Sequence, residues 1–451
     1  GGLGQTDIGN KVAITGKARE FYRRIGAHDG NEDQWVFEPL VADSNFRTII
    51  ATSSIRHYPG YWISKLKKSG RRITEVIFRQ QDNGKLLLIR AKMFIDCSYE
   101  GDLMAAAGVS YVVGRESSMT YGESLNGVQM RDKHQFPDAV DPWIIPGDAS
   151  SGLLWGISNE QLNVQGSGDR HVQAYNFRLC LTDDTANRIP ITRPQRYDST
   201  RYELLIRQLA VYTPDSLNWE LMHFAIMPNH KTDINNCGGF STDMIGSSDA
   251  YPEADWPERL TIIRDHKDYT LGLLYFISND NRIPKHLRNE MSRWGLPKDE
   301  FRNNGNFTPQ LYVREARRLK GPYVMTQRNC LGADRVKDGV GLAAYTMDSH
   351  NCQRVVVNGM VKNEGDVQVG GFPPYPVSYR SITPLASECE NLLVPVCLSA
   401  SHIAYGSIRM EPVFMVLGQS AATAAVMALD QKISVQDVDV QSLRRSLGFI
   451  D

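Results

Sequence analysis

The segment AKMFIDCSYEGD, residues 91–102, constrains the fold of this chain more than any other stretch. Its run from Met93 to Ile95 is continuously apolar, which is typical of a strand in a parallel sheet whose two faces are both covered. Asp96, Cys97 and Ser98 follow directly, at the strand's carboxyl end. Open α/β sheets bind ligands at this edge, so the segment predicts a ligand-binding strand end. A plain turn after the strand is the alternative interpretation.

Helix and strand patterns on both sides of this segment extend the α/β assignment. Residues 10–26 carry apolar side chains at near-helical spacing, with Gly26 suited to a C-cap, and a second helix is predicted to begin near Glu38. Residues 73–80 and 85–98 are predicted strands, separated by the turn residues QDNGK.

The rest of the chain divides into an irregular middle and a regular end. Residues from about 115 to 385 are rich in Trp, Tyr, Pro, Asn and Asp, which predicts a mixed domain with helices near 200–212 and 308–319. The C-terminal segment predicts a strand at 391–397, a polar connection at 399–410 and a helix at 411–430 with Pro412 in its first turn. The free N–H groups of that helix's first turn suit a negatively charged ligand group, with ordinary helix–sheet packing as the alternative.

Composition excludes some classes of function. The 451 residues suffice for roughly two or three domains, and the net charge of −1 lacks the concentrated basic character of nucleic-acid-binding proteins. No apolar run reaches the length of about 18 residues that a membrane span needs; residues 411–429 come nearest and are interpreted as a buried helix. The seven cysteines form no CxxC pair and no zinc-like spacing, which predicts mostly buried thiols.

Four segments together resemble the FAD-dependent oxidoreductase family of bacterial flavoproteins, over nearly the whole chain. They are GGLGQTDIGN at 1–10, FIDCSYEGDLMAAAGVSYVVGRE at 94–116, QRNCLGADRVKDG at 327–339, and SASHIAYGSIRMEPVFMVLGQSAATAA at 399–425. The resemblance implies an α/β fold with a Rossmann-like, glutathione-reductase-like FAD-binding domain in two parts, residues 1–110 and 386–451. Residues 111–385 would form an inserted mixed α+β substrate or cap domain.

The resemblance also implies which residues contact FAD. The loop GGLG would pass the ribityl–flavin region, the end of the strand at Asp96 would lie near the dinucleotide, and the segment from Arg409 would face the flavin. The implied contacts are Gly1, Gly2, Gly4, Asp96, Cys97, Ser98, Arg409, Met410 and Glu411. Neither the GxGxxG loop nor the acidic ribose-binding residue of such proteins occurs here. We therefore expect an N-terminally incomplete FAD domain: the full-length protein binds FAD, and this chain begins partway through the cofactor site.

Three residues are candidates for catalysis. His402 lies in the predicted loop before the flavin-facing helix, and a histidine can accept a proton at neutral pH; a structural histidine is the alternative. Tyr379 and Arg380 precede the terminal strand and are placed at the domain junction over the flavin. Arg380 suits an oxygen-rich substrate, with an interdomain salt bridge as the alternative.

A cluster of amides and charges suits substrate hydroxyl groups, which both donate and accept hydrogen bonds. The predicted substrate contacts are Asn229, Lys231, Asp233, Asn235, Asn236 and Arg328. A plain turn is the alternative for the first five. The spacing of Asp334, Asp338, Asp348 and His350 matches no Ca²⁺ or Zn²⁺ pattern, so no metal site is predicted.

The leading hypothesis is an FAD-dependent oxidoreductase that oxidises a small polar substrate, such as a carbohydrate-derived molecule, by hydride transfer to the flavin. An electron acceptor completes the cycle, and neither nucleic acid nor a membrane span is expected. One alternative is a non-catalytic binding protein on a flavoprotein scaffold with an incomplete cofactor site. The other is a polysaccharide lyase of the xanthan type, a label that some relatives carry, although no lyase constellation is found.

Overall fold

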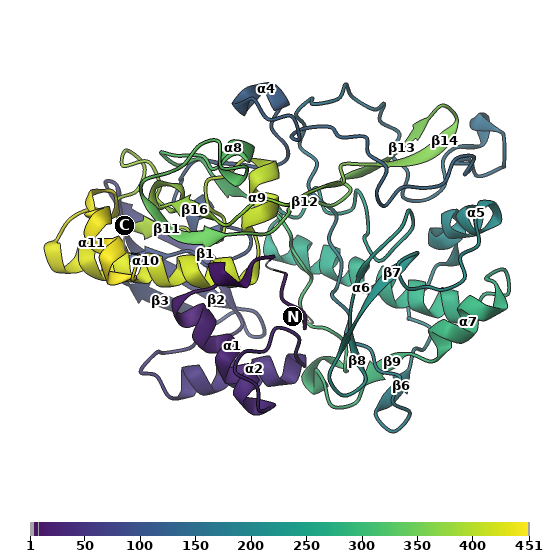
Figure 1. Ribbon diagram of the computed structural model, residues 1–451, viewed down its shortest axis with the longest axis horizontal. Coiled ribbons are helices and arrows are strands. Elements are labelled where there is room, and N and C mark those ends of the chain that lie inside the picture. Colours follow the sequence, from purple (N-terminus) through teal and green to yellow (C-terminus); the bar gives the residue numbers. More distant parts are fainter. Residues whose placement is uncertain (1–3, 8, 450–451) are drawn as a thin grey trace.

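The computed structural model describes residues 4–7 and 9–449 (Figure 1). The N-terminal segment (purple) and the C-terminal segment (yellow) lie together on one side of the molecule, and most of the middle of the chain (teal) lies on the other. Helices and small sheets are mixed throughout, which confirms the predicted α/β class in its general form.

The N-terminal segment forms α1 (Gly16–His28) and α2 (Pro39–Ala51), after a 3-10 turn at Lys11–Ala13. The helix α2 begins directly after Glu38, as predicted. The predicted C-cap at Gly26 is wrong, because this glycine is buried inside α1 and the helix continues to His28. The apolar side of α1 packs against α10, whose Val416 joins the same small core.

An antiparallel sheet follows, formed by β1 (Tyr61–Ser69), β2 (Arg72–Gln80) and β3 (Leu86–Arg90). The sequence did not predict β1, because its many lysines interrupt the apolar alternation. The predicted strand at 85–98 divides in two, since residues 91–93 separate β3 from β4 (Phe94–Ile95).

The strand β4 pairs in parallel with β17 (Leu392–Leu393), far away in the sequence. The Phe94 N–H donates to the Asn391 carbonyl at 2.9 Å and the Asp96 N–H to the Leu393 carbonyl at 2.8 Å. This confirms the parallel pairing expected from the apolar run. The carboxyl ends of the two strands therefore lie at one edge, next to the chain that follows each of them.

The middle of the chain packs around one large apolar core. The predicted helix near 200–212 is confirmed as α5, whereas the one at 308–319 is wrong: that segment holds loops and β10. The long α6 was missed, because buried polar residues such as Arg259 and His266 break its apolar period. The elements are α3 (Asp102–Ala106), β5 (Tyr111–Val112), α4 (Ser118–Tyr121), β6 (Arg188–Pro190), α5 (Glu203–Val211), β7 (Met222–Met227), β8 (Lys231–Asn236), α6 (Trp256–Asn279), α7 (Lys285–Ser292), β9 (Gly295–Pro297) and β10 (Arg318–Leu319).

The chain then returns toward the C-terminal side. Residues 325–347 and 367–382 share a core with the C-terminal helices, whereas Val361, in the hairpin between them, belongs to the large core of the middle segment. The predicted domain bounds at 110 and 385 stay predictions. The elements are α8 (Gln327–Cys330), β11 (Gly339–Ala343), β12 (Met347–Ser349), β13 (Gln353–Val357), β14 (Met360–Glu364), β15 (Val367–Val369), β16 (Tyr375–Ser378), α9 (His402–Ile408), α10 (Glu411–Gln431) and α11 (Val440–Ser446).

Two C-terminal helices carry the segment that resembles the flavoproteins. The polar connection predicted at 399–410 is wrong, because it contains α9, whose seven residues are all buried. The predicted helix is present as α10, with Pro412 in its first turn. Within residues 4–7 and 9–449, α10 is the one helix long and apolar enough to cross a membrane, yet 56% of its most apolar window is buried inside the protein.

Candidate active site

A cavity of about 1180 Å³ lies at the carboxyl ends of β4 and β17. Cys97 and Tyr99 follow β4, Val396 follows β17, and Glu411 is the first residue of α10; all four line this cavity. The other walls come from α1, α2, Arg178 and the segments 299–304 and 309–312. The lining is rich in aromatic side chains: Phe21, Tyr22, Phe37, Phe46, Tyr99, Phe301, Tyr312 and Phe414. A cavity of this size with eight aromatic side chains in its walls, at a strand-end edge, suits a flat organic ligand.

The loop after β4 is shaped by Asp96 and Ser98. The Asp96 carboxylate accepts hydrogen bonds from the Ser98 hydroxyl at 2.6 Å and from the Met104 N–H at 2.8 Å. The Ser98 hydroxyl oxygen in turn accepts from the Gly101 N–H at 3.0 Å. Both predicted FAD contacts are therefore engaged within the loop, and it is Cys97, between them, that lines the cavity.

Cys97 is the exposed one of the seven cysteines, all of which are free thiols. The six others are buried, which confirms the sequence-based expectation for most of them. Desolvation and the neighbouring Asp96 carboxylate raise the pKa of Cys97 to about 11. The thiol is therefore protonated at neutral pH and can contact a ligand, but it is a poor nucleophile.

Glu411 places a carboxyl group in the cavity wall at the N-terminus of α10. Its Oε2 atom is buried and has no hydrogen-bond partner among the described residues. Burial raises the pKa of Glu411, and the Asp7 carboxylate acts in the same direction. Desolvation and the charge of Glu411 also raise the pKa values of Tyr99 and Tyr312, so both phenols stay protonated. A hydrogen bond between the side chains of Tyr99 and Glu411 also contributes to the raised pKa of Tyr99, while Glu411 Oε2 itself stays without a partner among the described residues.

Arg178 supplies a fixed positive charge to the same cavity. Its Nε and Nη2 atoms donate to the Asp233 carboxylate at 2.8 and 2.9 Å, and Nη1 donates to Asp7 at 3.0 Å. The guanidinium also lies over the Tyr312 ring, 5.5 Å from its centroid. Although burial opposes the charge, these carboxylates hold the pKa of Arg178 well above its usual range.

The N-terminal glycines lie near this arginine or outside the described residues. The Gly4 N–H donates to the Asp233 carboxylate at 2.9 Å, so Gly4 is anchored beside Arg178. Gly4 is buried and is not among the residues that line the cavity. Gly1 and Gly2 fall outside the described residues. Whether these glycines contact the flavin stays a prediction.

Five of the six predicted substrate residues lie on the β7–β8 hairpin and are engaged with protein groups, whereas Arg328 lies in α8. Lys231 is fully buried and donates to Asp299 at 2.7 Å, to Glu300 at 2.9 Å and to Glu38. Those carboxylates raise the pKa of Lys231 and keep it charged. Because Asp299 and Glu300 line the cavity, Lys231 supports its wall from behind.

The other members of that set are dispersed. The Asn229 amide donates to Glu38 at 2.5 Å, and the Asn235 amide oxygen accepts from Arg314 at 3.1 Å. Asn236 is buried at the end of β8. Arg328 is on the surface, paired with Asp334 at 2.7 Å. None of the six predicted substrate residues is among the described residues that line the cavity, and their role in binding stays a prediction.

His402 is the first residue of α9 rather than part of a loop. Its Nδ1 lies 2.8 Å from a Glu315 carboxylate oxygen and its Nε2 lies 3.0 Å from the Ser349 hydroxyl. Burial, with the nearby cations Arg318 and Arg115, lowers the pKa of His402 to about 3. The imidazole is therefore neutral, has a partner at both nitrogens, and is not among the residues that line the cavity. Its part in catalysis stays a prediction.

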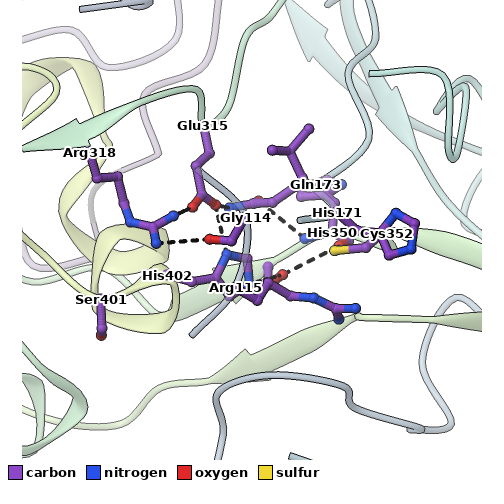
Figure 2. Close-up of polar contacts among 12 residues, drawn as sticks. Gly114, Arg115, His171, Gln173, Glu315, Arg318, His350, Cys352, Ser401 and His402 are labelled. Carbon is purple, nitrogen blue, oxygen red and sulfur yellow. Dashed lines mark hydrogen bonds and ion pairs between the residues drawn. The ribbon is translucent and has the colours of Figure 1, made fainter. Parts of the chain in front are cut away.

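The polar network around His402 joins the two sides of the molecule (Figure 2). Glu315 accepts from the Gln173 amide at 2.7 Å and pairs with Arg318. Nearby, Arg115 pairs with Glu364 at 2.7 Å. Opposite charges thus compensate each other in a region from which water is largely excluded, as buried charges require.

The same buried region holds the predicted flavin contact Arg409. Its guanidinium pairs with Asp348 at 3.0 Å, and Met410 next to it is buried. His350 lies 2.8 Å from Asp243 and 3.6 Å from Asp348. No group of three or more His, Cys, Asp or Glu side chains in the described chain is arranged to hold a metal ion.

Tyr379 and Arg380 lie elsewhere. The Tyr379 hydroxyl donates to the Val435 carbonyl at 2.6 Å, within the core of the C-terminal helices. Arg380 pairs with Asp338 at 2.9 Å and lies over the Tyr323 ring. Neither is among the residues lining the cavity, and a catalytic role for them stays a prediction.

Several cavity residues were missed by sequence reasoning. Tyr99 lies inside the quoted motif FIDCSYEGD and could have been named from it. Arg178, Tyr312 and the segment 299–304 carry no motif, and only the fold brings them to the strand ends.

A family model described as FAD dependent oxidoreductase matches residues 1–447, so the chain belongs to this family. No curated protein and no solved structure matches the chain.

Proposed function

We propose that this member of the FAD-dependent oxidoreductase family binds the flavin end of FAD in the cavity at the ends of β4 and β17, and oxidises a small polar substrate there. Carbohydrate-derived alcohols are one class of such substrates. The observation that carries the proposal is that Cys97 and Glu411, which come from two separate motifs of the family, line one cavity.

The residues of the cavity fit a flavin. Along α10, Phe414, Met415 and Gly418 line it, and a Cβ atom added at Gly418 would meet nothing within 4 Å. This leaves an open, flat stretch of helix, with Tyr99 and Tyr312 as further apolar walls. Bound FAD would supply a two-electron acceptor for a hydride, a chemistry that side chains cannot provide.

Within this proposal, Glu411 accepts the substrate's proton at Oε2. Glu411 lines the cavity, and its buried Oε2 has no hydrogen-bond partner among the described residues, so this atom has the capacity to accept a hydrogen bond from a substrate hydroxyl or amine that reaches it. Its raised pKa brings the carboxyl group closer to neutral pH, where a general base works best. Arg178, fixed by two carboxylates, orients oxygen atoms of the ligand.

His402 is the second candidate for the proton acceptor. Its neutral ring could accept a proton, but Ser349 and Glu315 already lie within hydrogen-bond distance of both nitrogens. For direct contact with a substrate in the cavity, these contacts would have to open. Glu411, by contrast, belongs to the lining of the cavity.

The test is reconstitution of the full-length protein with FAD. We expect absorbance bands at about 370 and 450 nm after unbound FAD is removed, as for any oxidised flavin. Bound flavin should also protect Cys97, the exposed thiol, from alkylation.

Gly418→Phe should abolish both signals by filling the cavity, whereas the matched Gly418→Ala should retain both. The proposal would be contradicted if the folded wild-type protein stayed colourless after reconstitution and if Cys97 were alkylated equally in Gly418→Phe and Gly418→Ala. A colourless protein that still binds a small molecule would favour the non-catalytic alternative.

A further inference from the structure

A second hollow, of about 430 Å³, shares no lining residue with the flavin cavity. It lies where the end of α5, the segment 132–138, the start of the β7–β8 hairpin and β14 meet. The residues that matter below are Asp132, Asp138, Gln208, Tyr212, Glu220 and Lys362.

Gln208 places a buried amide in this hollow. Its side chain is only 4% exposed, and its Oε1 accepts a hydrogen bond from the Phe240 N–H at 3.0 Å. The Nε2 group has no hydrogen-bond partner among the described residues. This N–H₂ group is not enclosed, and its two donors are available to an acceptor on a ligand.

The hollow also carries an excess of negative charge. Lys362 donates to the Asp138 carboxylate at 2.7 Å, so this pair is neutral. Glu220 accepts only a weak hydrogen bond from the Tyr212 hydroxyl, at 3.3 Å, and Asp132 has no cationic partner among the described residues. Donors and free carboxylate acceptors thus occur side by side, which suits hydroxyl groups, and the charge disfavours anionic ligands.

Aromatic rings complete the hollow and its surroundings. Tyr212 lines it and is 49% exposed. Trp219, directly before Glu220, does not line the hollow; its ring stacks on that of His223, with the centroids 3.8 Å apart, and the residue is 65% exposed and has a φ of +68°. A large non-glycine residue in the left-handed region is strained, and such strain concentrates at binding sites.

We propose that this hollow binds the ring of a neutral or amino sugar. The Gln208 Nε2 donates to a sugar hydroxyl, the Glu220 and Asp132 carboxylates accept from hydroxyl or ammonium groups, and the Tyr212 ring packs against the sugar's C–H face. Trp219 adds an aromatic contact for a second ring. The site does not depend on flavin binding.

The test is titration of the full chain with D-glucosamine, D-glucose and D-glucuronate by saturation-transfer NMR. Monosaccharides of this size should bind with Kd on the order of 1 mM. We expect glucosamine to bind most tightly, and glucuronate at least about 10-fold more weakly than glucose because of the local carboxylates. Absence of saturable binding by all three sugars would overturn the proposal.

Three variants identify the site. Gln208→Glu keeps the acceptor for the Phe240 N–H but removes the free donor, and should weaken glucose binding about 10-fold. Tyr212→Leu should weaken it similarly, while Tyr58→Leu, at a comparably exposed tyrosine outside the hollow, should not. Trp219→Gly should leave the unfolding midpoint unchanged or raised, by relieving backbone strain, yet weaken binding of a disaccharide such as cellobiose. Sugar binding unaltered in Gln208→Glu and Tyr212→Leu would place it elsewhere and refute the assignment.

Discussion

Glu411 and His402 begin neighbouring helices but have different surroundings. The Glu411 carboxyl lines the large cavity and has an unpartnered Oε2. The His402 ring has a partner at each nitrogen, Glu315 at Nδ1 and Ser349 at Nε2, and its backbone N–H donates to Glu116. A substrate can bind to a hydrogen-bonding atom that has no partner within the fold. We therefore expect Glu411 to affect the rate of flavin reduction and His402 to affect the stability of the fold.

Glu411→Gln should keep flavin bound but slow its reduction. The amide has the shape of the carboxyl group but cannot accept a proton, and loss of a general base costs roughly 10²-fold or more in rate. Anaerobic stopped-flow at the flavin absorbance measures the reduction rate, and the flavin spectrum gives the occupancy. Glu258→Gln, in the first turn of α6, is the matched control. Equal reduction rates in both variants would exclude Glu411 as the base.

His402→Gln tests the pH dependence of stability. The folded pKa of His402, about 3, lies below the ordinary value of about 6.5, so the unfolded chain binds the extra proton between these values. The wild-type free energy of unfolding therefore falls as pH decreases below 6.5, by up to about 1.4 kcal/mol per pH unit.

The variant lacks this dependence. At pH 7 we expect the variant to be less stable than the wild type by about 1–3 kcal/mol, because it loses hydrogen bonds. At pH 5 we expect this difference to be smaller by about 2 kcal/mol, because only the wild type loses stability on acidification. Urea unfolding at both pH values measures the difference. A constant difference would show that His402 is not held neutral by its surroundings.

At the scale of elements, strong local patterns predicted their structures and weak ones did not. The apolar run before Asp96 gave a parallel strand, and Pro412 marked the start of α10. By contrast, β1 and α6 were not predicted, because the lysines of β1 and the buried polar residues of α6 interrupt the apolar periodicity of the sequence. The buried α9 resembles a loop because its small and polar residues are satisfied only by tertiary contacts.

Substitution of alanine for two helical glycines near the site should change the stability of the protein in opposite directions. In α10, Gly418→Ala places a methyl group in open space and should stabilise the protein by about 0.5–1 kcal/mol through helix propensity. In α9, a Cβ at Gly406 would lie 2.6 Å from the Asp348 carbonyl oxygen, so Gly406→Ala should destabilise by about 1–3 kcal/mol. Thermal unfolding of both variants measures these effects; equal changes would contradict the close packing of α9.

At the scale of the whole molecule, buried ion pairs join segments distant in sequence. The Glu364 carboxylate accepts from Arg115 Nη1 at 2.7 Å, the Gln129 N–H at 2.6 Å and the Gln353 amide at 3.0 Å. Because all of these groups are buried, each depends on the others for compensation of its charge or polarity.

Glu364→Gln should therefore destabilise the protein by about 3–5 kcal/mol, since it leaves the Arg115 guanidinium with less compensation in a buried site. Denaturant unfolding measures the loss. Asp43→Asn, which removes the exposed pair with Arg47, should have little effect. Similar small effects of both substitutions would show that the buried network contributes no more than a surface pair.

The sequence by itself determined the α/β class, the parallel strand at β4, the helix α10 and the family. It also identified Cys97 and Glu411, because both lie within local motifs at the ends of regular elements. These features depend on periodicity and spacing among neighbouring residues, which a linear pattern records.

Only the tertiary structure decided which side chains share the cavity and which are engaged elsewhere. Arg178 and Tyr312 reach the strand ends from the middle of the chain, while His402, Lys231 and Arg409 are occupied by partners distant in sequence. The physical reason is that the state of a buried polar group depends on charge compensation and hydrogen bonding by its spatial neighbours. Those neighbours are set by the packing of the whole chain.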